Sequence, residues 1–188
     1  GLLWILNPFL ITMIVFGHGS QMMTAAFFPI TLYLLIRLKD KQSISYMLLF
    51  ALALGLQLQR AHVQIAYYAS MFLGFFFIYS FYKNRSKKYA TLFFSAIVIA
   101  FLIASHIYLP SLDYREMSIR SSDMGSFAYA TNWSMHPKEL LTYIIPNYYG
   151  FGGSTYEGFM PFTDFPNYVG VLVPVSYTHL TLPTTYGV

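Results

Sequence analysis

Long apolar runs separated by short polar breaks make up the chain as far as Pro110. The runs cover residues 2–16, 22–36, 43–58, 65–82 and 89–109. Because a helix needs about 20 predominantly apolar residues to cross the hydrocarbon core of a bilayer, each run predicts a membrane-spanning helix. We therefore expect an all-α membrane protein, a polytopic bundle of about five transmembrane helices.

Two of these runs carry features that a membrane helix must accommodate. Pro29 lies inside the second run, where it predicts a kink that is tolerated when neighbouring helices serve the freed backbone carbonyl. The third run, residues 43–58, is short for a span unless its polar end enters the protein interior. Pro110 is expected to end the fifth run.

The part that follows the fifth run is mostly polar and aromatic, and it predicts an extracytoplasmic segment over residues 111–168. Within it, residues 137–145 have the pattern of a short amphipathic helix. Pro137 suits the first helical turn, and Glu139 favours the positive end of the helix. Residues 169–174 are apolar again and predict the start of a further span.

Both ends of the chain indicate an internal fragment. The first residue is Gly1, no initiating Met precedes it, and the sequence begins inside an apolar run. Residues 175–184 read VSYTHLTLPT, which is the translation of a transposon-type sequencing adapter. We interpret residues 175–188 as adapter-derived and exclude them from fold and function, as one would a fusion scar.

Composition favours a membrane protein and excludes several chemistries. Hydrophobic residues are 56% of the chain and charged residues 10%, against about 25% charged residues in soluble domains. The absence of cysteine excludes disulfides, thiolate metal sites and cysteine nucleophiles. The net charge of +4 is interpreted from where the charges lie, and we expect no nucleic-acid partner.

The distribution of Lys and Arg between alternate loops predicts the orientation. Seven lie on one side of the predicted membrane, in residues 37–41 and 83–88, against four on the other. Since positive charge is enriched in cytoplasmic loops, the first group is expected in the cytoplasm. Residues 17–21, residues 57–64 and everything after Pro110 then share the extracytoplasmic face.

Residues 57–64, which read QLQRAHVQ, form a polar corner between two apolar runs. An arginine, a histidine and three glutamines cost free energy beside lipid unless they face water, protein or a ligand. Arg60, His62 and Gln64 are suited to hydrogen-bond an anionic or hydroxylated ligand. The other interpretation is that the polar corner only caps a turn at the membrane surface.

Other candidate groups are scattered along the chain. Asp113 and Glu116 stand three positions apart and would share a helical face as base or metal ligands, unless they form only a solvated surface. Arg120 is suited to clamp phosphate or to pair with lipid headgroups. Trp133 and Tyr149 are suited to stack on sugar rings or to anchor at the membrane interface.

The remaining motifs argue against common enzyme classes. The histidines do not follow the spacing of a zinc hydrolase. The glycine-rich loop at residues 147–154 lacks the Lys-Ser/Thr pair of a phosphate-binding loop. No serine lies in a nucleophile-elbow context, so covalent acyl transfer is not supported.

A series of motifs follows one another along the chain. They are residues 17–23 (GHGSQMM), 57–68 (QLQRAHVQIAYY), 108–114 (YLPSLDY), 118–120 (SIR), 129–134 (YATNWS) and 137–150 (PKELLTYIIPNYYG). In order and spacing, this series resembles the bacterial YfhO family, and the resemblance covers nearly all of residues 17–170.

That family is similar to the GT-C glycosyltransferase superfamily, whose multi-spanning members move a sugar from a polyprenyl-phosphate carrier onto an extracytoplasmic acceptor. The resemblance implies inverting transfer at the bacterial cytoplasmic (inner) membrane. A carboxylate would orient the acceptor hydroxyl, and cationic groups would stabilise the departing lipid phosphate. The catalytic acid of such proteins lies in an early outer loop, so we expect it to precede this fragment.

The resemblance also implies partners and binding residues. The partners are membrane lipid, a polyprenyl-phosphate-linked sugar and a cell-envelope glycopolymer acceptor, and a divalent metal is compatible with the chemistry. The residues expected to bind substrate are His18, Gln21, Gln57, Arg60, His62, Gln64, Tyr67, Arg120, Trp133 and Tyr149.

Two other functions stay open at this stage. A transporter or flippase of polyprenyl-linked sugars would use the polar corner for passage rather than chemistry. Inverted repeats would mark such a transporter, and none is visible in the sequence. A non-enzymatic membrane assembly protein is the third hypothesis, in which replacing Arg60 and His62 has no effect on function.

Overall fold

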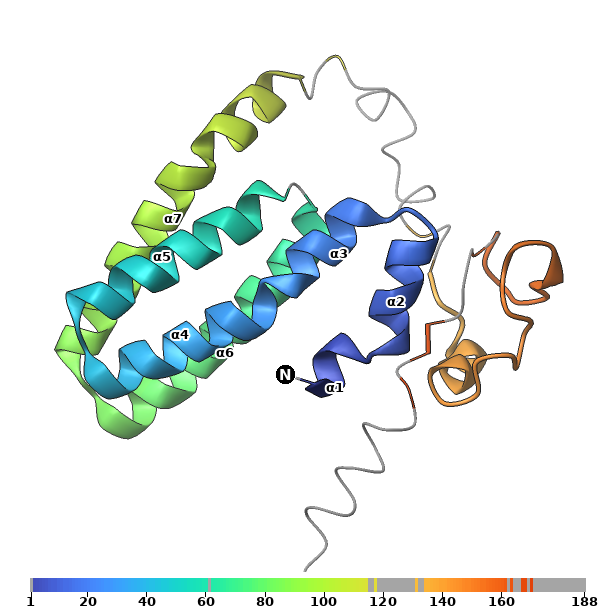
Figure 1. Ribbon diagram of the computed structural model, residues 1–188, viewed down its shortest axis with the longest axis horizontal. Helices are drawn as coiled ribbons and strands as arrows, with labels where there is room; N and C mark the ends of the chain where they lie inside the picture. The colour runs from blue at the N-terminus through green and yellow to red at the C-terminus, as the bar shows by residue number, and fades with distance from the viewer. Residues whose placement is uncertain are drawn as a thin grey trace, which may run out of the picture. The chain divides into compact units, whose positions relative to one another are not determined.

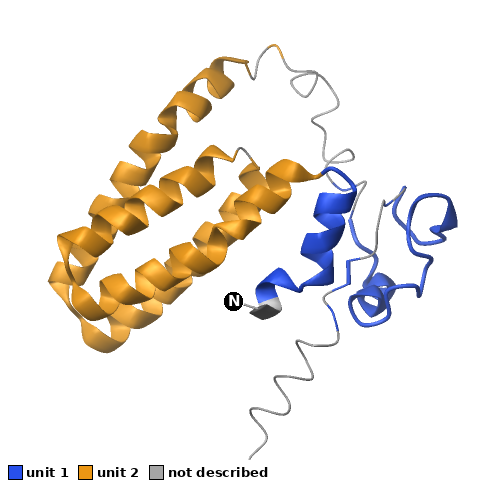
Figure 2. Ribbon diagram, in the orientation of Figure 1, with its two compact units in different colours: residues 1–17, 119–188 blue, residues 18–118 orange. Residues whose placement is uncertain are grey.

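The computed structural model describes residues 2–60, 62–114, 117, 131, 134–161, 163, 167, 168 and 170. Over these residues the chain is all-helical, apart from an isolated bridge between Tyr148 and Gly150. The all-α fold class is thereby confirmed. The chain divides into two compact units, coloured separately in Figure 2: unit 1 is Gly1–Gly17 with Ile119–Val188, and unit 2 is His18–Ser118.

Unit 2 is a bundle whose successive long helices run in alternating directions (Figure 1). Its elements are α3 (Gly19–Ala26), α4 (Phe28–Lys41), α5 (Ile44–Gln59), α6 (Val63–Asn84) and α7 (Lys87–Tyr114). Helix α5 lies centrally, because it packs on α4 and most extensively on α7. The buried core gathers side chains from α4 to α7.

Three helical segments in the described part of unit 2 are long and apolar enough to cross a membrane. They are Gly19–Lys41 with 23 residues, Val63–Asn84 with 22 and Lys87–Tyr114 with 28, the last with a mean hydropathy of 2.3. Helix α5 is apolar but has only 16 residues, about 24 Å at 1.5 Å per residue. The expected membrane-type helices are thus present, whereas the count of five spans stays a prediction.

Two proline positions depart from the expected helix boundaries. Residues 2–16 form two helices, α1 (Leu2–Ile5) and α2 (Pro8–Val15), instead of one. The break arises because Asn7 caps α2 through its side-chain oxygen, which accepts from the N–H of Phe9 at 2.9 Å, with Pro8 in the first turn. Pro110 does not end α7, so that expectation was wrong: the helix continues for another turn to Tyr114.

Small residues bring α5 and α7 close together. Ala96, Ala100 and Ala104 recur along one face of α7 and are completely buried. A methyl group added at Gly55 on α5 would lie 2.9 Å from Cβ of Ile103 on α7. In a membrane, lipid tails are as apolar as the helices, so close backbone approach through small residues supplies much of the packing energy.

Aromatic rings fill the space between α6 and α7 near their connecting turn. The rings of Phe77 and Phe93 stack with centroids 4.0 Å apart, and Phe77 also contacts Tyr89 at 5.3 Å. Phe93 extends the cluster to Phe50 on α5 at 6.1 Å. Three helices are therefore held together by one stacked aromatic cluster, which contributes about 0.5–1.5 kcal/mol per pair beyond area burial.

The two turns at this end of the bundle are built alike. Gln42 and Arg85 each end a helix in the left-handed conformation, with φ of 44° and 45°. A serine follows each of them as the N-cap of the next helix, and its hydroxyl accepts the N–H of the tyrosine three positions on. The hydroxyl of Ser86 also donates to Oε1 of Gln42 at 2.8 Å, which ties the two turns together.

A buried glutamine makes hydrogen bonds to residues on both sides of the break between α3 and α4. The break falls at Phe27, just before Pro29, and carbonyls in the last turn of a helix lack donors within the helix. Gln57 of α5 donates from Nε2 to the carbonyl of Thr24 at 3.1 Å, and its Oε1 accepts the Thr31 hydroxyl at 3.4 Å. Gln57 is only 1% exposed. Gln57 of the neighbouring α5 thus supplies the donor for the Thr24 carbonyl, whereas the Ala25 carbonyl, which Pro29 leaves without its usual donor, accepts the N–H of Phe27.

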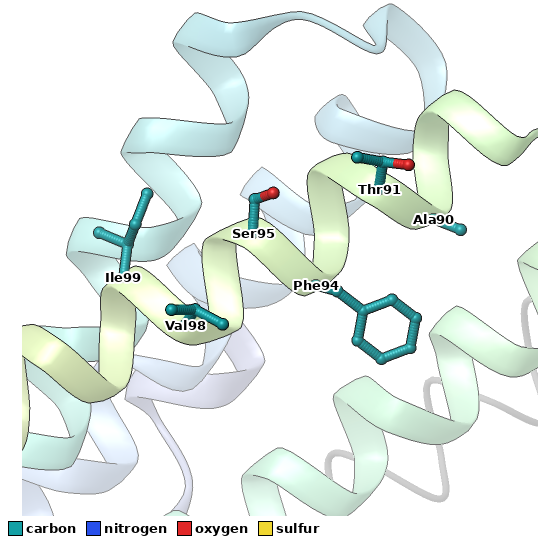
Figure 3. Close-up of a pocket in the computed structure, with 6 residues that line it drawn as sticks. All are labelled: Ala90, Thr91, Phe94, Ser95, Val98 and Ile99. Atoms are coloured by element: carbon teal, nitrogen blue, oxygen red, sulfur yellow. The ribbon is translucent and has the colours of Figure 1, made fainter.

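The outer face of α7 carries a shallow apolar groove of about 630 Å³. Figure 3 shows that its lining side chains all come from this one helix: Ala90, Thr91, Phe94, Ser95, Val98 and Ile99. The Thr91 hydroxyl donates back to the carbonyl of Lys87 at 3.1 Å. Because that hydroxyl is already bonded to its own helix, the face suits contact with lipid tails.

Replacing Gly55 by alanine tests the close α5–α7 packing. The added methyl would force Ile103 to move, so the free energy of unfolding in detergent should fall by about 1–3 kcal/mol. Gly74→Ala in α6 is the matched control, because nothing lies within 4 Å of the added group. That variant should be neutral or more stable by up to about 1 kcal/mol. Equal effects of the two substitutions on a denaturation curve would contradict this packing.

Candidate functional site

The polar corner lies at the turn between α5 and α6, at one end of unit 2. Helix α5 ends at Gln59, Arg60 follows as its C-cap, and His62 is the N-cap of α6. The Nδ1 atom of His62 accepts a hydrogen bond from the backbone N–H of Ile65 at 3.3 Å. With Nδ1 as the acceptor, the neutral ring carries its proton on Nε2, which is able to donate to a ligand.

Two further elements reach the polar corner. His18 is the N-cap of α3, and it lies close enough to affect His62 electrostatically. Burial lowers the pKa of His62 below its ordinary value of 6.5, and the charge of His18 lowers this pKa further. Helix α7 passes the same end, where the Tyr108 hydroxyl donates to the carbonyl of Leu58 at 3.2 Å. The start of α3, the α5–α6 turn and the outer part of α7 therefore meet.

Part of the polar corner is structural. Nε2 of Gln59 donates to the carbonyl of Ile103 at 2.9 Å, and Nδ1 of His106 lies 2.9 Å from the same oxygen. Gln57 is occupied in the helix break, inside the bundle rather than at a surface. These amide groups hold α3, α5 and α7 together, so they are already satisfied without a ligand.

Arg60 is the strongest ligand-binding candidate of the polar corner. The ion pair found in the described part of the chain joins Lys39 to Asp40 at 3.2 Å, at the other end of unit 2, and does not involve Arg60. The guanidinium of Arg60 donates from Nε to the carbonyl of Leu56 at a long 3.4 Å. Its terminal N–H groups match the oxygens of a phosphate bidentately. His62 follows two positions later, with His18 near it, so this end of unit 2 gathers groups that suit an anion.

The other predicted binding residues of unit 2 lie around this end with more exposure. Gln64, in the first turn of α6, donates from Nε2 to the hydroxyl of Tyr68 at 3.3 Å, in an exposed position. Tyr67 is exposed and contacts the ring of Tyr68, with centroids 5.9 Å apart. Gln21 lies half-buried in the first turn of α3.

The predicted residues beyond Tyr114 are less well placed. Glu116, Arg120 and Trp133 lie outside the described residues, so their roles stay predictions. Asp113 is exposed in the last turn of α7. In the described part of the chain, no group of three or more His, Asp or Glu is arranged to hold a metal ion.

Unit 1 is organised by a buried carboxylate that the sequence did not single out as an anchor. The predicted amphipathic helix is a 3-10 helix, η4 (Pro137–Tyr143), and Glu139 on it is 1% exposed. Its Oε1 accepts the hydroxyl of Tyr156 at 2.6 Å and the N–H of Phe159 at 2.5 Å. Charge-assisted bonds of this length are the strong ones. Glu139 therefore fixes the fold of residues 139–159.

Tyr149 takes its position from this anchor. Its ring contacts Phe159 at 5.6 Å and Tyr148 at 4.9 Å, both nearly perpendicular. Phe159 in turn stacks on His136 at 4.0 Å. Burial, and then the neighbouring Tyr148 and Glu139, raise the pKa of Tyr149, so its hydroxyl stays a hydrogen-bond donor at neutral pH.

No protein-family model matches the chain, and neither a curated protein nor a solved structure is similar to it. What the fold defines is therefore a class: over the described residues, an all-helical protein with three helices long and apolar enough to cross a membrane. Its candidate sites are the polar corner in unit 2 and the residues around Tyr149 in unit 1.

His62 predicts a pH dependence of stability. Its pKa is lowered in the folded protein, so the unfolded chain binds the proton more readily, and the free energy of unfolding rises with pH in a window just below 6.5. Above this window both states are neutral and the contribution is constant. Asparagine keeps the capping oxygen, so His62→Asn should match the parent protein at pH 8 and lack its extra acid sensitivity. An unchanged pH profile in this variant would exclude His62 as the source.

Proposed function

We propose that the chain is part of a GT-C-type integral membrane glycosyltransferase. It would transfer a sugar from a polyprenyl-phosphate carrier to a cell-envelope acceptor on the extracytoplasmic face of a bacterial cytoplasmic membrane. The observation that carries the proposal is the position of Arg60 and His62 at the turn between α5 and α6, with His18 close enough to His62 to lower its pKa. Cationic and donor groups thus gather at the ends of membrane-type helices. A lipid-linked phosphate would reach this position from the bilayer.

The chemistry needs negative charge to be stabilised on the departing lipid phosphate. Arg60 supplies a fixed positive charge with two parallel N–H groups, and His62 supplies a neutral Nε2–H donor. Both sit at helix termini, where the backbone fixes their positions before substrate arrives. Such preorganised donors stabilise developing charge with little reorganisation, which lowers the barrier to transfer.

The acceptor hydroxyl needs a carboxylate that removes or orients its proton. Asp113 is the described candidate, because it lies on α7 a little beyond Tyr108, whose hydroxyl contacts the end of α5. Glu116 is the second candidate. Inverting transfer would then pass the sugar directly from the lipid phosphate to the acceptor oxygen, while that oxygen's proton goes to the carboxylate.

A transporter or flippase of lipid-linked sugars is the second candidate function. It is favoured by the two similar turns, in which a left-handed residue, a capping serine and a tyrosine recur in the same order. Phe50 and Phe93 follow these tyrosines at equal distances along α5 and α7. Repeated helical hairpins of this kind are typical of transporters.

Arg60 variants decide between these functions. In membranes that contain the protein, sugar transfer from polyprenyl-phosphate-linked glucose should fall roughly 10- to 100-fold in Arg60→Ala, the loss expected for a charged hydrogen bond. Arg60→Lys should retain part of the activity, since it keeps the charge and loses the bidentate geometry. Arg85→Ala is the control, because Arg85 lies in the turn at the other end of the bundle. Movement of the lipid-linked sugar across vesicles without any transfer would favour the transporter.

A further inference from the structure

A concave surface of about 740 Å³ lies in unit 1, outside the polar corner. We name it the aromatic hollow. Its lining residues are Asn147, Tyr148, Tyr149, Gly150, Phe151, Thr155 and Glu157. It joins two tyrosines and a phenylalanine to an amide, a hydroxyl and a carboxylate within one short stretch of chain. The polar corner does not use any of these groups.

The backbone of the aromatic hollow folds back on itself in a way that needs glycine. Gly150 has a φ of +83°, and a Cβ built there would lie 1.7 Å from the carbonyl oxygen of Thr155. Beside this close approach, the N–H of Glu157 donates to the carbonyl of Tyr149 at 2.9 Å. Any larger residue at position 150 would push the two sides of the loop apart.

The loop that lines the aromatic hollow is held by the Glu139 anchor. Tyr156, which lies between the lining residues Thr155 and Glu157, and Phe159, two positions further on, both donate to the Glu139 carboxylate. Phe159 then sets the ring of Tyr149 through an edge contact. A binding surface whose rings are fixed before ligand arrives loses less entropy on binding.

The groups that line the aromatic hollow suit a polyhydroxylated ring. The rings of Tyr148 and Tyr149 stand at 83° to each other, which leaves exposed ring surface for the C–H face of a sugar. Glu157 is exposed and accepts two hydroxyl hydrogens, and Asn147 both donates and accepts. The Thr155 hydroxyl already donates to the carbonyl of Gly152 at 2.8 Å, so it serves the loop itself. A quaternary ammonium would also fit aromatic rings with a carboxylate. It has no N–H to donate, however, and would leave the amide of Asn147 unused.

We propose that the aromatic hollow binds a neutral pyranose unit of a glycan, with its ring on Tyr148 or Tyr149 and two adjacent hydroxyls on the carboxylate of Glu157. This inference deepens the proposed function, since it gives the acceptor glycan a binding site separate from the lipid phosphate. Binding of the sugar itself does not depend on transfer, so the two are testable apart.

Saturation-transfer NMR on the whole chain tests this inference. The protein is kept in a detergent without sugar groups, and the probes are the methyl glycosides of glucose, galactose, mannose and N-acetylglucosamine. At least one glycoside should receive saturation at its ring C–H protons. Glu157→Gln, on an exposed side chain that does not alter the fold, should reduce this signal at least fivefold, and Tyr148→Ala should abolish it. Tyr82→Ala, an exposed tyrosine of unit 2, is the matched control and should leave it unchanged.

Three outcomes would overturn the inference. No saturation of any of the four glycosides is the first, and an equal signal from the parent protein and Glu157→Gln is the second. The third is displacement of the glycoside by millimolar choline together with direct saturation of choline, which would make the aromatic hollow a cation site. Arg60→Ala should keep the glycoside signal. Loss of polyprenyl-phosphate binding in that variant, with the glycoside signal intact, would therefore concern the donor site alone.

Discussion

A helix break inside an apolar bundle must have its backbone hydrogen bonds served by another part of the protein, because lipid provides none. Gln57 meets this constraint for the break between α3 and α4 by donating to the carbonyl of Thr24 and accepting from Thr31. The rest of unit 2 depends on it, since the same residue fixes how the end of α5 lies against α3. Once α5 is placed there, the turn that follows brings His62 near His18.

The polar corner thus has two layers with different roles. On its inner side, the amides of Gln57 and Gln59 are already hydrogen-bonded where α3, α5 and α7 pack together. Its outer groups, Arg60 and His62, are fixed as helix caps and are the groups that we propose to bind an anion. Unit 1 repeats the logic on a smaller scale: the buried Glu139 holds the loop, and the exposed Glu157 and tyrosines line the aromatic hollow. In both units a buried polar side chain positions less buried groups of different chemistry.

The long apolar runs of the sequence were sufficient to predict helices that are long and apolar enough to cross a membrane, because such runs leave few other structures in lipid. Local proline effects were harder to predict. Asn7 with Pro8 ended a helix by capping, whereas Pro110 near a helix end was tolerated. The gathering of His18 with the α5–α6 turn followed from alternating helices. The sequence could not show which glutamine faces inward. Gln57, Gln59 and Gln64 are the same residue type and differ only in the partner that packing gives them. Glu139 was missed as an anchor for the same reason, since burial depends on Tyr156 and Phe159 far along the chain.

Photo-crosslinking tests the central claim, that the polar corner binds a lipid-linked phosphate, most directly. A polyprenyl-phosphate-linked sugar with a diazirine next to the phosphate is irradiated with the protein in membranes, and the labelled peptides are identified by mass spectrometry. Labelling is expected at residues 57–68 and 17–23. In Arg60→Ala this labelling should be suppressed, because the probe no longer competes with bulk lipid for the polar corner. Labelling confined to the turns around residues 42 and 85 at the other end of the bundle, or unchanged in Arg60→Ala, would contradict it.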